Sequence, residues 1–176
     1  MQTSQKGGDA TNDVEAPKTV LGVATLVTLL LFFLVFLLSV SWFVPQIDDF
    51  LVLIHLIQPG PILDFVGLFL FCGGVLLNGW SRFARKNMAS SWEMSDDHTL
   101  VTTGPYGWIR HPSYSSYLIC IVSVNFLIPS VLSLLLLMGI PAYYSISRYE
   151  EELLISQFGD EYHRYMRQTG RFIPHI

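Results

Sequence analysis

Long apolar runs separated by short polar stretches dominate this chain after its first eighteen residues. Residues 20–44 carry no charge, and at about 1.5 Å of rise per residue such a run crosses a hydrocarbon core of about 30 Å with some tilt. Residues 62–81 form a second apolar run that contains four glycines, a residue type that lets membrane helices approach closely. Both runs predict transmembrane helices, and residues 45–61 between them predict a connector that lies flat on the membrane.

Two further apolar runs, residues 113–128 and 131–147, are joined only by a short stretch around Pro129, which predicts an antiparallel helical hairpin. Each run is short for a full crossing, and Pro141 predicts a kink in the second one. After Ser147, aromatic and apolar residues recur at helical spacing between charges, which predicts an amphipathic helix on the cytosolic membrane surface, interrupted at Gly159.

These patterns predict an all-α, polytopic integral membrane protein with about four transmembrane helices, including a C-terminal hairpin. Residues 1–18 are polar and are expected to be a disordered tail. Residues 19–176 are expected to form one membrane-embedded domain. The composition agrees with this class, because the chain is 51% hydrophobic and only 14% charged, whereas soluble domains carry about 25% charged residues.

The positive charges predict the orientation. All ten lysines and arginines fall within residues 1–19, 82–112 and 148–176, and the two loops on the other side of a four-span arrangement carry none. By the positive-inside rule, both termini and the polar stretches next to the hairpin face the cytosol. The net charge of −4 gives no basic surface for nucleic acid, and the two cysteines fall inside apolar runs as packing residues.

Two polar clusters flank the hairpin. Arg110, His111 and Tyr114 precede its first helix, and residues 148–152, which include three glutamates, follow its second helix. Ionisable groups are costly near hydrocarbon, so two clusters at one membrane face indicate a functional site. Taken singly, each cluster also fits an aromatic and basic interfacial anchor or a solvated helix face. No spacing matches a metal-ligand set or a nucleophile with its base, so neither a metal nor covalent catalysis is expected.

The motifs in this order resemble the isoprenylcysteine carboxyl methyltransferase family. They are His-Thr-Leu-Val at residues 98–101, Arg-His-Pro-Ser-Tyr at 110–114, Glu-Glu and Phe-Gly-Asp-Glu-Tyr within 150–162, and Gly-Arg-Phe-Ile-Pro at 170–174. The resemblance implies S-adenosylmethionine as cofactor, bound by segments 92–114 and 148–174. The residues implied in cofactor binding are His98, Thr99, Leu100, Val101, Tyr106, Arg110, His111, Pro112, Ser113, Tyr114 and Glu151.

One departure concerns the acceptor. The family carries an arginine, thought to meet the substrate carboxylate, where this chain has Ile146, and the nearest arginine is Arg148. Two helix positions differ by about 200° around the axis, so Arg148 replaces that arginine only if the helix end is distorted. Arg148 and Glu151 are the catalytic candidates, and Glu151 is expected to pair with the amino group or the sulfonium side of the cofactor.

The resemblance implies methyl transfer from S-adenosylmethionine to the carboxylate of a prenylated cysteine or related isoprenoid acid at the cytosolic face. The apolar acceptor is expected to arrive through membrane lipid, its chain lying beside Gly67, Gly73 and Gly74. Two alternatives stay open: N-methylation of a lipid amine such as a phospholipid headgroup, and a non-enzymatic membrane protein of the same fold. An amine must be neutral to attack, so its methylation should accelerate with pH.

Overall fold

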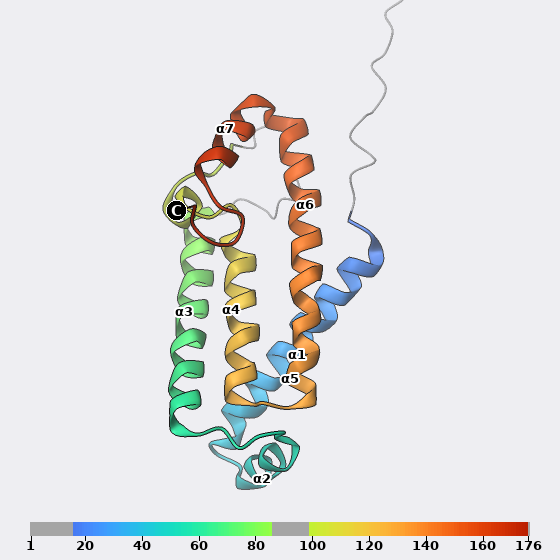
Figure 1. The fold of residues 1–176 in the computed structure, drawn as a ribbon, viewed down its shortest axis with the longest axis vertical. Helices are drawn as coiled ribbons and strands as arrows, with labels where there is room; N and C mark the ends of the chain where they lie inside the picture. The colour runs from blue at the N-terminus through green and yellow to red at the C-terminus, as the bar shows by residue number, and fades with distance from the viewer. Residues whose placement is uncertain (1–15, 86–98, 176) are drawn as a thin grey trace, which may run out of the picture.

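The computed structural model describes residues 16–85 and 99–175 of the protein, which fold into a bundle of helices (Figure 1). The elements in chain order are α1 (Lys18–Ser41), α2 (Pro45–Ile54), α3 (Pro61–Arg85), the 3₁₀ turn η1 (Gly104–Gly107), α4 (Pro112–Leu127), α5 (Val131–Leu135), the 3₁₀ turn η2 (Leu136–Met138), α6 (Gly139–Phe158) and α7 (Asp160–Gln168). The predicted all-α class of polytopic membrane protein is confirmed.

Three stretches of the described chain are helical, long and apolar enough to cross a membrane: α1, α3, and residues 131–158, which run through α5, η2 and α6. The helix α4 is apolar but shorter, at 16 residues, as the sequence predicted. In Figure 1, α3, α4 and α6 stand side by side and α1 crosses the bundle obliquely. The charged ends of α3, α4 and α6 gather at one end of the bundle, and α2 lies at the other.

The second helix of the hairpin is longer than predicted. Its apolar run ends at Ser147, but α6 continues to Phe158, so the acidic residues lie on a continuous helix. A 3₁₀ turn at residues 136–138 disturbs the second helix of the hairpin near Pro141, where the sequence predicted a kink. In a regular α-helix the ring of Pro141 would clash with the carbonyl of residue 137, which lies in this turn. The predicted amphipathic helix is divided at Gly159, whose φ of +50° ends α6 and lets α7 turn back.

The helices α3 and α4 pack through small residues. A β-carbon on Gly67 would lie 2.7 Å from Leu127, and one on Gly74 would lie 2.7 Å from the sulfur of Cys120, whereas Gly73 faces open space. The space that the sequence assigned to a lipid chain at Gly67 and Gly74 is therefore filled by α4 itself. That expectation was wrong because glycines that could admit a ligand serve equally well to bring two backbones together.

Two polar contacts reinforce this pair of helices. The amide nitrogen of Asn78 donates to the hydroxyl of Ser116 over 2.8 Å, and the hydroxyls of Ser81 and Ser113 lie 2.9 Å apart. Such contacts between membrane helices contribute about 0.6–2 kcal/mol each. The second contact joins the end of α3 to the first turn of α4, which is where the polar clusters meet.

Candidate functional site

The turn before α4 is fixed against the end of α3. Gly104 has a φ of +62°, a conformation that suits glycine, and a β-carbon there would lie 3.2 Å from that of Ala84 and 3.3 Å from the indole nitrogen of Trp80. This close approach buries Pro105 and Tyr106 beside the last turn of α3. The chain then enters α4 at Pro112, where the missing N–H of proline costs no helical hydrogen bond.

The C-terminal tail pairs with the segment that precedes α4. The backbone N–H of Arg110 donates to the carbonyl of Gly170 over 2.8 Å, and that of His111 donates to the carbonyl of Arg171 over 3.1 Å. In return the N–H of Gly170 donates to the carbonyl of Trp108 over 3.1 Å. These bonds hold two segments about sixty residues apart in the chain against each other, and they bring the side chain of Arg171 into the polar cluster.

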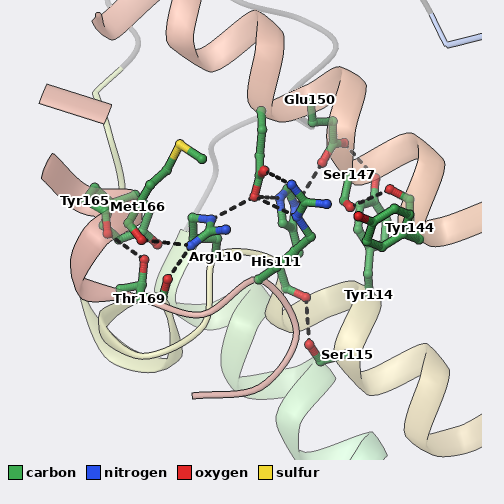
Figure 2. Close-up of polar contacts among 12 residues, drawn as sticks. Arg110, His111, Tyr114, Ser115, Tyr144, Ser147, Glu150, Tyr165, Met166 and Thr169 are labelled. Atoms are coloured by element: carbon green, nitrogen blue, oxygen red, sulfur yellow. Dashed lines mark hydrogen bonds and ion pairs between the residues drawn. The ribbon is translucent and has the colours of Figure 1, made fainter. Parts of the chain in front are cut away.

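Glu151 is at the centre of a buried ion network. Figure 2 shows Arg110, His111 and Glu150 at this place. One carboxylate oxygen accepts from Nε of Arg110 at 2.7 Å, from Nε of Arg171 at 3.2 Å, and lies 3.2 Å from Nε2 of His111. Arg171 also reaches the second oxygen with a terminal nitrogen. A buried carboxylate needs this many partners to offset its loss of water, so Glu151 depends on α4, α6 and the tail together.

His111 lies between the two buried carboxylates of α6. Its Nδ1 is 3.3 Å from Glu150, and its Nε2 faces Glu151. Burial alone would lower the pKa of His111, but the hydrogen bonds and charges of Glu150 and Glu151 outweigh it and raise that pKa. With both ring nitrogens as donors, the protonated imidazole satisfies both carboxylates. Glu150 also accepts a hydrogen bond of 2.6 Å from the hydroxyl of Tyr114.

The two arginines of the network are fully engaged. A terminal nitrogen of Arg110 donates to the carbonyls of Met166, at 3.2 Å, and of Thr169, so this guanidinium also ties α7 to the site. The guanidinium carbon of Arg171 lies 5.0 Å from the ring centroid of Tyr144 in a cation–π contact. Both side chains thus hold the site together rather than presenting free positive charge.

The structure brings most of the sequence-predicted residues together. Tyr106, Arg110, His111, Pro112, Ser113, Tyr114 and Glu151 all lie at this end of the bundle, around the contacts just described. Leu100 and Val101 are half-buried, Thr99 is exposed, and His98 lies outside the described residues. Their roles in binding a cofactor stay predictions.

Arg148 lies apart from this cluster. On α6 the neighbouring Ile146, Glu150 and Glu151 are buried, whereas Arg148 is exposed and makes no side-chain hydrogen bond or ion pair within the described part of the chain. The helix is regular here, so the distortion that would bring Arg148 to the position of Ile146 does not occur. Sequence reasoning gave no role to Arg171, although the Gly-Arg-Phe-Ile-Pro motif of the tail was the signal that could have found it.

Comparison with known proteins places this arrangement in a family. The profile of the phospholipid methyltransferase family matches residues 63–161, more than half of the chain. The chain belongs to that family. Arg110, His111, Glu150 and Glu151 all fall within the matched residues, whereas Arg171, the other arginine of the network, lies outside them.

The curated relatives of the chain have a more specific name than the family profile has. The chain is 37% identical over 92 residues to protein-S-isoprenylcysteine O-methyltransferase of Tribolium castaneum, and 33% identical over 91 residues to the human protein of that name. Each match covers 48% of this chain and about a third of the relative, 31% and 30% respectively. The resemblance that the motifs carry is thereby confirmed.

A solved structure supports the fold. The eukaryotic intramembrane Ras methyltransferase ICMT (isoprenylcysteine carboxyl methyltransferase) superimposes with a TM-score of 0.54 over 93% of this chain and 55% of its own, at 24% identity. The two proteins therefore share a fold. The matched segments span about a third of the length of these curated relatives, and the superposition spans 55% of the solved chain.

Proposed function

We propose that the protein transfers a methyl group from S-adenosylmethionine to the carboxylate of a prenylated cysteine or a related isoprenoid acid, at the cytosolic face of a membrane. The observation that carries this proposal is the buried network of Glu151, His111 and Arg110. It stands where the apolar helices end, within the residues that match the family. Relatives named isoprenylcysteine O-methyltransferases support the choice of acceptor.

The chemistry of the site fits this cofactor. S-adenosylmethionine carries an ammonium, a carboxylate, a sulfonium and an aromatic base. Glu150 suits its positive groups, because it has no arginine partner among the described residues, whereas Glu151 is held by two arginines. The rings of Tyr106 and Tyr114 beside Glu150 suit a sulfonium or a base. When bound, the cofactor supplies a methyl group already activated for transfer, so the protein needs no covalent catalyst.

The state of His111 favours a carboxylate acceptor. A free carboxylate with a pKa of about 3.5 is ionised at neutral pH and attacks without a general base. His111, with both ring nitrogens facing carboxylates and its pKa raised, is poorly suited to accept a proton. The residues of the site then have to orient the acceptor and exclude water, and good alignment is worth about 7–11 kcal/mol.

The position of the site suits two ligands that arrive by different routes. The polar cluster lies at the end of the bundle where the positive charges of the chain gather, a charge distribution that supports a cytosolic placement. A polar cofactor reaches that end from water. An acceptor with an apolar chain reaches it along the exposed apolar sides of α1 and α3, through membrane lipid.

N-methylation of a lipid amine is the second candidate function. The family profile that matches the chain is named for phospholipid methyltransferases, and the arginine that the resemblance implies at the position of Ile146 is absent. A lipid amine must lose a proton before it attacks, so its methylation rate should rise with pH toward the pKa of the amine. Carboxyl methylation should be flat over the same range.

The deciding experiment measures transfer of radiolabelled methyl from S-adenosylmethionine to N-acetyl-S-farnesylcysteine by detergent-purified protein, with Glu151→Gln as the inactive control. Release of the label as methanol in base is expected, because methyl esters are base-labile. Label on an added phospholipid amine, stable to base, would favour the second candidate. Absence of both label and cofactor binding would leave the non-enzymatic alternative.

A further inference from the structure

One arginine at this end of the bundle has a buried nitrogen with which no described residue pairs. Arg85 is the last residue of α3, and its Nε is buried with no hydrogen-bond partner among the described residues. Arg110 and Arg171, by contrast, are bound by Glu151. Arg85 as a whole is half-buried, but a buried guanidinium nitrogen without a partner is costly, so the position calls for an acceptor.

Arg85 projects from the face of α3 that contacts the site. Ser81, four residues earlier and so on the same helix face, lies 2.9 Å from Ser113 in the first turn of α4. Ala84 and Trp80 on the same turns pack against Gly104. These contacts place the end of α3 beside the η1 turn and the first turn of α4.

The charges of Arg85 and Glu150 both reach Tyr106. Burial raises the pKa of the Tyr106 hydroxyl, the positive charge of Arg85 opposes that rise, and the negative charge of Glu150 adds to it. Both charges therefore act on one phenol, which also contacts Ser113. The site thus offers a positive charge with which no described residue pairs, beside a tyrosine, which is an arrangement for a ligand that carries a negative group.

We propose that Arg85 is the anion-binding residue of this site and pairs with the carboxylate of a ligand. The proposal rests on the proposed function, and that function supplies two carboxylates: the one on the methionyl end of the cofactor and the one on the acceptor. A planar guanidinium is suited to hold a carboxylate through two parallel hydrogen bonds. Arg85 thereby takes the task that the sequence assigned to Arg148.

The first test compares two nucleosides that differ in the carboxylate. S-adenosylhomocysteine carries the amino-acid group, and 5′-methylthioadenosine lacks it. If Arg85 holds the carboxylate of the cofactor, Arg85→Gln weakens binding of the first by about 10- to 100-fold and leaves binding of the second unchanged. Arg82→Gln, a change at an exposed arginine one turn earlier on α3, is the matched control and should alter neither.

The second test addresses the acceptor. If Arg85 instead holds the acceptor carboxylate, Arg85→Gln leaves S-adenosylhomocysteine binding intact but weakens binding of N-acetyl-S-farnesylcysteine, and not that of its uncharged methyl ester. Arg85→Lys keeps the charge but loses the paired geometry. Its affinity for the ligand that carries the carboxylate should lie between the affinities of wild type and of Arg85→Gln. If Arg85→Gln does not fold, Arg85→Lys provides both comparisons.

The role of Arg85 would be overturned if Arg85→Gln lost the same affinity for both ligands of each pair, the one with the carboxylate and the one without it. It would also be overturned if Arg85→Gln and Arg82→Gln bound these ligands equally well. Either result would leave the proposed function standing. Wild-type protein that binds neither nucleoside and neither farnesyl compound would overturn both.

Discussion

The two sides of α4 are built in different ways. Toward α3 it meets two glycines, Gly67 and Gly74, and a β-carbon on either would lie 2.7 Å from a side chain of α4. Toward α6 it presents Tyr114 and Tyr117, whose rings lie 5.4 Å and 5.6 Å from the ring of Tyr143. The first interface brings two backbones together, whereas the second holds them apart with large side chains.

The two sides of α4 therefore have different roles: the α3 side supports the fold, and the α6 side carries the charged residues of the site. Small residues leave no space between α3 and α4, so that pair forms a rigid base. On the α6 side, His111 lies between Glu150 and Glu151. Arg171 of the tail also reaches Glu151. The buried ion network therefore lies on the α6 side, while α3 brings its last residue, Arg85, to the same end of the bundle.

The largest effect is expected from a substitution on the α6 side, at Glu151. Glu151→Gln leaves Arg110, Arg171 and His111 without their shared carboxylate, and removing one partner of a buried ionic network costs about 3–5 kcal/mol. The unfolding midpoint in detergent should fall and methyl transfer should be lost. Glu152→Gln, at the exposed neighbour, is the control and should behave as wild type. Equal stability of the two variants would contradict a structural role for the network.

A smaller effect is expected on the α3 side. Gly74→Ala places a methyl group 2.7 Å from the sulfur of Cys120, and such overpacking costs about 1–3 kcal/mol. Gly73→Ala, on the adjacent open face, should instead be neutral or stabilise the helix by up to about 1 kcal/mol. Thermal unfolding of the two variants measures the difference. Destabilisation of the same size in both would show that α3 and α4 are not packed as described.

The pH dependence of stability tests the state of His111. Because its pKa is raised by Glu150 and Glu151, it contributes stability that is fully present below its unfolded pKa of about 6.5 and is lost as pH rises through the folded value. Each unit of elevation is worth about 1.4 kcal/mol. His111→Gln should flatten this dependence, and His163→Gln, at an exposed position, should leave it unchanged. A wild-type profile that is flat above neutral pH would exclude a protonated His111.

The smallest effect is expected at Arg148. This side chain is exposed and lies away from the network, and surface substitutions usually change stability by no more than about 0.5 kcal/mol. Arg148→Gln should therefore leave both unfolding and methyl transfer close to wild type, in contrast to Glu151→Gln three residues later. A large loss of activity in Arg148→Gln, with folding intact, would restore its predicted catalytic role.

Much of the site was predictable because its residues lie in short, contiguous motifs. The run from Arg110 to Tyr114 and the pair Glu150–Glu151 are separated by a hairpin whose turn is visible in the sequence, so their meeting at one membrane face followed from the topology. Local motifs do not specify which partner each charge takes. Arg171 reaches Glu151 only because the tail pairs with residues 108–111, and no periodic pattern indicates that pairing.

The sequence by itself determined the apolar helices, their short hairpin and the single end at which the positive charges gather, because these depend on hydrophobic length and charge count along the chain. Only the tertiary structure decided that Gly67 and Gly74 close an interface and that the hairpin helix continues through the acidic run. It alone showed that Arg148 faces outward, whereas Nε of Arg85 is buried with no partner among the described residues. The physical reason is that burial and pairing depend on which distant segment packs against a residue, and that is set by the fold as a whole.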